Sequence, residues 1–223
     1  MSTPLTFRPY QPSASDIVYR DKLPHRSRKG RTIFITWRLS DSLPPLAVLE
    51  ESIRQAQGRW LAKENLHLCP WSQDVEKILK HQDPEKQLAY RRVSFRVREQ
   101  FAAKKLGSCV LGQQAAVEAL RQAIFEEEKW GSGIGDLVVC YNHVHLLMVP
   151  DGEGDLQQPM QRIKGRASRY LGLAGLVNLP KPIWQRSWFD HVVRNQHKLA
   201  RIRKYIADHP VPCRDAYYKG VWT

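Results

Sequence analysis

The order of hydrophobic and polar positions along the chain predicts alternating strands and helices. Runs rich in β-branched and aromatic residues are typical of strands, and they occupy residues 32–39, 137–140, 144–149 and 184–193. Helices are expected from Pro45 to about residue 57, at 111–130, around 160–171 and at 195–207, where apolar residues recur at helical spacing or capping and breaking residues mark the ends. This order predicts an α+β fold, a ferredoxin-like antiparallel sheet with helices on one face and an additional C-terminal helix.

Residues 58–107 interrupt this order because they are polar and strongly charged, with helical patches and no clear core pattern. We interpret them as a helical, polar insertion and not as a separate domain. The predicted organisation is then a polar basic leader at 1–29, a main domain at 30–212 that contains the insertion, and a C-terminal tail at 213–223.

The composition excludes several classes of protein. With 42% hydrophobic and 26% charged residues, the chain is expected to fold around a core. It contains no apolar run of the roughly 18–20 residues that a membrane span needs, and its start lacks the apolar stretch of a secretory signal. The four cysteines form no CxxC pair, so a zinc finger or a disulfide framework is not expected. We therefore expect a cytoplasmic protein with reduced thiols and no membrane partner.

The charge of the chain indicates a polyanionic partner. The formal net charge is +13, and the stretch from Gln161 to Thr223 holds thirteen basic and only three acidic residues. A basic surface of this kind attracts nucleic acid and speeds its capture. Charge alone also fits an anionic membrane surface or a merely solubilising surface, so it does not decide the partner.

The histidines of His143-Val144-His145 are the sharpest local feature. In a strand, residues two apart point to the same face, so both imidazoles would project together. That geometry suits chelation of a divalent cation, although alternating histidines also occur as ordinary surface or half-buried residues. Two histidines cannot complete a metal site, so a third protein ligand must come from elsewhere in the chain.

Tyr205 and His209 lie four residues apart at the end of the last predicted helix, and therefore on one face of it. If that face lay beside the histidine pair, His209 could be the missing ligand and Tyr205 a nucleophile next to the metal. The spacing permits this arrangement without selecting it, because a half-buried tyrosine and a capping histidine would show the same pattern.

Four ordered blocks resemble the REP-associated tyrosine transposases, which belong to the single-tyrosine HUH (histidine–hydrophobic–histidine) transposase family. The resemblance covers roughly residues 25–212, including WRLSDSLP at 37–44. The blocks are YNHVHLL at 141–147, RIKGR at 162–166, IWQRSWFDHVVRN at 183–195 and KYIADHP at 204–210.

The resemblance implies a fold and a site. It implies a ferredoxin-like domain in which His143 and His145 bind Mg²⁺ or Mn²⁺, and in which Tyr205 on the last helix is the nucleophile. His209 falls where the family usually carries Asn or Gln that helps to hold the metal, so the metal preference of this chain is open. Tyr141 stands where family members commonly have proline, in the turn ahead of the motif.

The implied activity is cleavage and rejoining of single-stranded DNA at REP-type palindromic hairpins through a 5′-phosphotyrosine intermediate. The implied setting is a bacterial, nucleoid-associated protein, and the family often forms homodimers. Phosphate contacts or base stacking are expected from seven residues, although aromatic residues in a short strand more often belong to the core. These residues are Arg162, Lys164, Arg166, Arg169, Trp184, Arg186 and Arg194.

Two other interpretations differ in their chemistry. A catalytically impaired DNA-binding protein of the same fold would keep the basic face, and His209 in place of the usual amide is the only departure that favours it. A histidine-triad nucleotide hydrolase would need a third histidine two positions after His145, where the chain has Leu147. The spacing therefore excludes the hydrolase.

Overall fold

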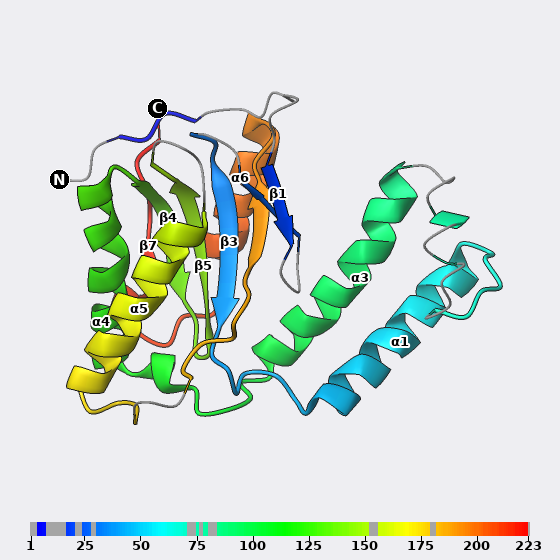
Figure 1. Cartoon of the computed structure of the whole chain (residues 1–223), viewed down its shortest axis with the longest axis horizontal. Helices are drawn as coiled ribbons and strands as arrows, with labels where there is room; N and C mark the ends of the chain where they lie inside the picture. The colour runs from blue at the N-terminus through cyan, green and yellow to red at the C-terminus, as the bar shows by residue number, and fades with distance from the viewer. Residues whose placement is uncertain are drawn as a thin grey trace. The chain divides into compact units, whose positions relative to one another are not determined.

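A five-stranded antiparallel sheet organises the larger part of the computed structural model (Figure 1). The structure describes residues 4–7, 17–20, 24–27, 30–70, 75, 78–79, 84–151, 156–178 and 182–222. The sheet confirms the predicted α+β class. Its strands, in their order across the sheet, are β6 (Phe189–Val192), β3 (Ile33–Arg38), β5 (His143–Val149), β4 (Gly133–Val139) and β7 (Tyr217–Tyr218).

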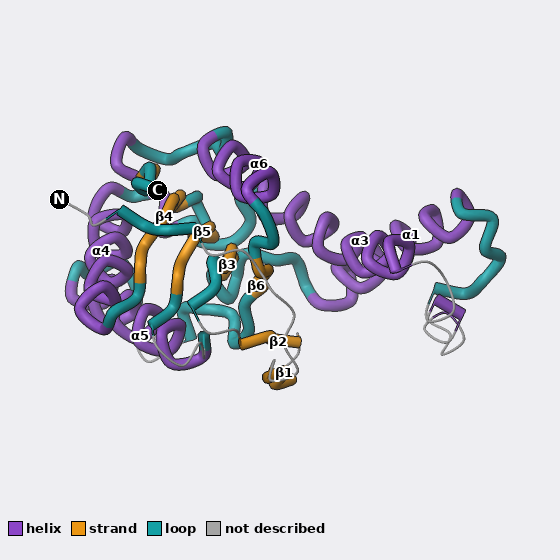
Figure 2. Tube along the Cα trace, turned by 90° about the horizontal axis from the view of Figure 1, so that it is seen from above, coloured by secondary structure: helices purple, strands orange, loops and turns teal. Residues whose placement is uncertain are grey.

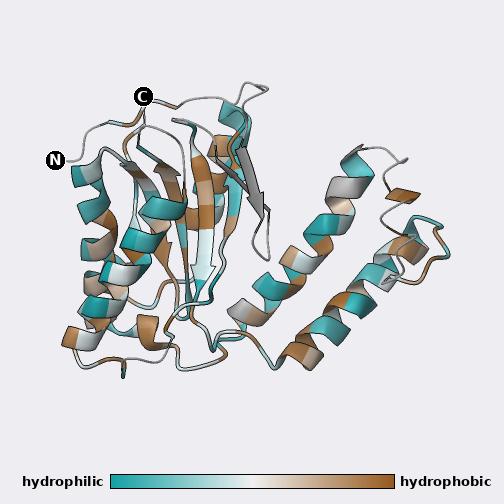
Figure 3. Ribbon diagram, in the orientation of Figure 1, coloured by the Kyte–Doolittle hydropathy of each residue, from teal (hydrophilic) through white to brown (hydrophobic). Residues whose placement is uncertain are grey.

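Two helices cover one face of this sheet and a third lies on the other (Figure 2). Helices α4 (Gln114–Phe125) and α5 (Gln157–Leu173) enclose the main core together with Ile35 and Trp37 of β3. Helix α6 (Gln196–Ala207) belongs to a smaller apolar cluster on the other face, which includes Phe34, the residue directly before Ile35. The period of two along β3 thus gives each face its own core, and Figure 3 shows hydrophobic residues concentrated on the central strands.

Short strands also lie near both ends of the chain, outside residues 30–212. Strand β7, within the predicted tail, pairs with β4. In the predicted leader, strands β1 (Ile17–Arg20) and β2 (Pro24–Ser27) pair with each other. The last predicted strand at 184–193 is shorter in the structure, because Trp184 makes only an isolated bridge to Leu39. Most of the leader and residues 152–155 lie outside the described residues.

Short 3₁₀ helices complete the connections between these elements. The helix predicted at 111–130 divides into α4 and η2 (Glu126–Trp130), and η1 (Val110–Gly112) precedes it. A third, η3 (Arg214–Ala216), leads into β7. None of the described helices combines the length and the apolar character that crossing a bilayer requires.

Residues Asp41–Gly107 form a separate compact unit, and Met1–Ser40 with Ser108–Thr223 form the other. Within the first of these, α1 (Leu46–Lys63) and α3 (Pro84–Ala103) pack against each other. This unit is larger than the insertion predicted at residues 58–107. It also contains the start of α1, which continues past residue 57 to Lys63. It also has small apolar clusters of its own, which the charged composition concealed; their buried members are Leu49, Ile53 and Val97, and Leu61, Val75, Leu79 and Tyr90.

Candidate active site

The hairpin between β4 and β5 brings the histidine pair to the α6 side of the sheet. The Cys140 N–H donates to the His143 carbonyl at 2.8 Å, closing a tight turn through Tyr141 and Asn142. Across the neighbouring strand β3, Arg38 lies opposite His143 and Thr36 lies opposite His145. Directly opposed residues of antiparallel strands place their side chains on one face, so these groups share the face that α6 covers.

Helix α6 carries the other two candidate residues to the same place. Asn195 caps the helix by accepting from the Lys198 N–H at 2.9 Å. Buried Leu199 and Ile206 bind α6 to the sheet, and Arg203 pairs at 3.0 Å with Asp136, a buried carboxylate of β4. These contacts fix the end of the helix over the histidine pair.

Three imidazoles converge through the same ring nitrogen. The Nε2 atom of His145 lies 3.1 Å from Nε2 of His143 and 3.2 Å from Nε2 of His209. Their other nitrogens are occupied: Nδ1–H of His143 donates to the Asn142 amide oxygen, and Nδ1–H of His209 donates to the Tyr205 carbonyl. Both rings therefore direct an Nε2 lone pair at the point of convergence, which is how histidine binds a metal.

His145 is the central and most buried member of this cluster. Its Nδ1 contacts the Thr36 hydroxyl at 2.8 Å, and its ring stacks on Phe34 with centroids 5.5 Å apart. Burial lowers the pKa of His145 well below its ordinary value, and the neighbouring His209 and Arg38 lower it further. The ring is consequently neutral at physiological pH, the form that coordinates a metal.

The Tyr205 hydroxyl lies at the edge of the cluster, 3.5 Å from Nε2 of His145. Its ring packs edge-on against His145 and His209, and 37% of the residue remains exposed. The hydroxyl is thus next to the converging nitrogens, on a residue that is partly exposed to solvent.

Cys140 and Arg38 belong to the same neighbourhood, and the sequence reasoning did not select them. One donor atom from each of Cys140, His143, His145 and His209 lies within 4.8 Å of all the others. Imidazole and thiolate suit transition metals, whereas Mg²⁺ prefers oxygen ligands. The residues present therefore fit a divalent transition-metal ion, and the predicted Mg²⁺ fits them less well.

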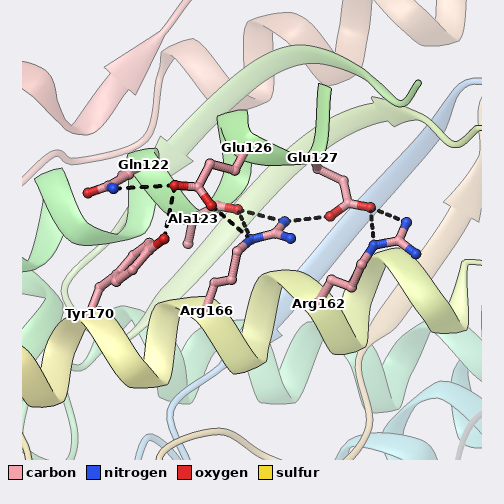
Figure 4. Close-up of polar contacts among 7 residues, drawn as sticks. All are labelled: Gln122, Ala123, Glu126, Glu127, Arg162, Arg166 and Tyr170. Atoms are coloured by element: carbon pink, nitrogen blue, oxygen red, sulfur yellow. Dashed lines mark hydrogen bonds and ion pairs between the residues drawn. The ribbon is translucent and has the colours of Figure 1, made fainter. Parts of the chain in front are cut away.

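Arg162 and Arg166, which were expected to contact DNA, pair inside the protein (Figure 4). Both guanidinium groups bind Glu127 of η2, whose side chain is fully buried. Arg166 also donates to the Ala123 carbonyl at 3.0 and 3.1 Å. The hydrogen bond to Glu127 is the main cause of the raised pKa of Arg162. These two arginines join α5 to α4 and η2, so we leave them out of the proposed DNA contacts.

The same network includes a tyrosine of α5. The Tyr170 hydroxyl donates to Glu126 at 2.9 Å. This hydrogen bond lowers the pKa of Glu126 and raises the pKa of Tyr170. Tyr170 is thereby held in the helix-packing contact, away from the histidine cluster.

Lys164 and Trp184 also have structural partners. The Lys164 ammonium donates to the carbonyls of Gln185 and Arg186 at 2.7 and 2.9 Å. The buried Trp184 donates its indole N–H to the Lys164 backbone carbonyl and to the Ser168 hydroxyl. Three predicted contact residues remain exposed on the surface, namely Arg169, Arg186 and Arg194.

The fold and the site define a class of protein, in which an antiparallel sheet presents a histidine cluster to a helix that carries a tyrosine. Residues 110–209 match the family model described as "Transposase IS200 like". The matched segment contains His143, His145, Tyr205 and His209. The part of the chain that holds the site is thus similar to the IS200-like transposases, in agreement with the resemblance found in the sequence blocks.

Two solved structures show weaker similarity. A REP-associated tyrosine transposase bound to a REP hairpin is 18% identical, with a TM-score of 0.41, over 84% of this chain and 68% of that one. A candidate transposase from Deinococcus radiodurans R1 is 13% identical, with a TM-score of 0.33, over 91% of this chain and 98% of that one. Neither similarity is strong enough to support a conclusion about function. Among curated proteins, no match was found.

Proposed function

We propose that this protein is a metal-dependent single-stranded DNA endonuclease and transposase that uses Tyr205 as its nucleophile. The observation that carries the proposal is the convergence of three Nε2 atoms beside the Tyr205 hydroxyl, with 3.1, 3.2 and 3.5 Å between neighbouring atoms. All four residues lie inside the transposase match. A histidine cluster without an accessible nucleophile would instead favour a metal-storage site or a structural metal site.

The proposed reaction conserves the number of phosphoester bonds. The phenol proton passes to solvent, the Tyr205 oxygen bonds to the phosphorus, and the bond from phosphorus to the 3′ oxygen breaks. The leaving 3′ oxygen takes a proton from solvent, so the products are a 3′-OH and a 5′-phosphotyrosine. Attack by another 3′-OH reverses these steps and joins two strands without ATP. A tyrosine with a pKa near 10 is a weak nucleophile at neutral pH. The cation that His143, His145 and His209 would hold supplies charge stabilisation at the phosphate.

We expect replacement of either strand histidine to remove cleavage and leave most DNA binding. His143→Ala or His145→Ala should lower Mn²⁺-dependent cleavage by at least about a hundredfold, since loss of metal stabilisation costs several kcal/mol. EDTA should have the same effect on the unmodified protein. The matched control is His197→Ala, because His197 is exposed near the start of α6. Cleavage that persists when both His143 and His145 are replaced by alanine, and also in EDTA, would contradict the role of the metal.

The proposed DNA surface is electrostatic and includes the exposed Arg169, Arg186 and Arg194. The excess of basic residues after Gln161 supports it. Affinity for single-stranded hairpins should fall as salt rises, with a log–log slope of roughly 0.7 for each phosphate neutralised. A salt titration by fluorescence anisotropy measures this slope. An affinity that is insensitive to salt, or no weaker for random duplex, would contradict the proposal.

REP-type palindromic hairpins are the proposed substrate because of the sequence blocks that resemble the REP-associated enzymes. The test incubates the protein with labelled single-stranded hairpins and Mn²⁺ and resolves covalent adducts on a denaturing gel. A binding protein that has lost cleavage would retain these hairpins and form no adduct. His209 in place of the usual amide favours that alternative, but the 3.2 Å contact of its Nε2 with His145 supports a working ligand.

A further inference from the structure

We infer that Cys140 is a fourth metal ligand and that its thiolate makes the site prefer a softer ion, such as Zn²⁺ or Co²⁺, over Mg²⁺ or Mn²⁺. This inference rests on the metal site of the proposed function and concerns the selectivity of that site. It assigns a role to a residue that the histidine motif does not include.

The backbone places Cys140 beside His143. The hydrogen bond from the Cys140 N–H to the His143 carbonyl makes these two residues the paired ends of the β4–β5 turn. Paired residues of a hairpin project to the same face. Cys140 directly follows β4, so it forms a row with His143 of β5 and Arg38 of β3, in which His143 lies between the other two.

The distances are close to those of a four-ligand site. With bonds of 2.0–2.1 Å to nitrogen and 2.3 Å to sulfur, a tetrahedral ion with three nitrogen ligands and one sulfur ligand separates these atoms by roughly 3.3–3.6 Å. The neighbouring Nε2 atoms are 3.1 and 3.2 Å apart, and the whole set of four donor atoms lies within 4.8 Å. Side-chain movements of about 1 Å would complete the geometry.

The chemistry of the fourth donor determines the preferred ion. A thiol must lose its proton to coordinate, so binding of a soft ion releases one proton from Cys140 and forms a metal–sulfur bond. Zn²⁺ and Co²⁺ stabilise such a bond, whereas Mg²⁺ binds oxygen ligands almost exclusively. Cys140 is buried among apolar residues such as Phe34 and Leu147. Thus the competing explanation is a cysteine that only fills space in this cluster.

Titration of the DNA-free protein with Co²⁺ distinguishes these explanations. Coordination by Cys140 should produce a near-ultraviolet thiolate-to-cobalt charge-transfer band, in addition to the visible bands of a histidine site. Cys140→Ser should lose the ultraviolet band and keep the visible ones. Its Zn²⁺ dissociation constant should rise at least about tenfold, a conservative value given that even outer-shell changes cost 10–100-fold. Cys69→Ser is the matched control, because Cys69 is exposed.

A second variant tests the inference without altering Cys140. Replacing Cys69, Cys109 and Cys213 together by serine leaves Cys140 as the only thiol, and the charge-transfer band should remain. Absence of the band in the unmodified protein, or its survival in Cys140→Ser, would overturn the inference. The Mn²⁺-dependent adduct at Tyr205 is measured separately, so failure of the Cys140 role is distinguishable from failure of the proposed function.

Discussion

Replacing Tyr205 by phenylalanine is expected to abolish the covalent protein–DNA adduct while hairpin binding stays within about twofold of the original. The substitution removes one oxygen and leaves the ring packed against His145 and His209. Adduct formation should fall by at least about a thousandfold, as for other enzymes that lose their nucleophile. A denaturing gel measures the adduct, and anisotropy measures binding.

Two other tyrosines provide matched controls for this variant. Tyr141 precedes the histidine pair in the hairpin turn, and Tyr217 lies on β7, where burial raises its pKa. Neither hydroxyl is expected to attack DNA, so Tyr141→Phe and Tyr217→Phe should form normal amounts of adduct. A full yield of adduct from Tyr205→Phe would show that another group is the nucleophile.

Replacing Glu127 by alanine is expected to lower the free energy of unfolding by about 3 kcal/mol, the lower end of the range for breaking a buried ion pair from one side. Glu127 is fully buried and binds both Arg162 and Arg166 (Figure 4). Without the carboxylate, two guanidinium groups lose their partner between α5 and η2. Because both arginines retain 19–24% exposure, water compensates part of the loss.

Chemical denaturation with a matched variant measures this effect. Glu118 of α4 is exposed, and Glu118→Ala should change the free energy of unfolding by less than about 0.5 kcal/mol. Glu127→Gln keeps an oxygen that can accept from an arginine. Its decrease in the free energy of unfolding should therefore lie between those of Glu118→Ala and Glu127→Ala. Equal stability of the Glu127→Ala and Glu118→Ala proteins would contradict the structural role of the pair.

The elements with a strong local pattern could be predicted from the sequence. The β-branched and aromatic run of β3, the mainly apolar run of β5 and the apolar spacing of α6 all depend on neighbours within a few positions. The period of two in β5 also placed His143 and His145 on one face before the sheet was known. The proximity of Tyr205 and His209 to His145 does not follow from a local pattern. It depends on how α6 packs on a strand about 60 residues earlier in the sequence.

Some of the candidate residues have partners far along the chain that a local sequence pattern does not show. The sequence predicts that Arg162 and Arg166, on one face of α5, contact phosphate. In the structure both bind Glu127, which is 35 and 39 residues away in sequence. Charge composition cannot distinguish a cation facing a buried carboxylate from one facing solvent. Cys140 was overlooked for a related reason, since only the turn geometry brings its thiol beside His143.

Mapping the covalent adduct tests the central claim most directly. The unmodified protein is incubated with a single-stranded REP hairpin and Mn²⁺, digested, and the DNA-linked peptide is identified by mass spectrometry. The account predicts one 5′-phosphate linkage, on Tyr205, formed only when the metal is present. DNA attached to any other residue, or an adduct that forms equally well in EDTA, would contradict it.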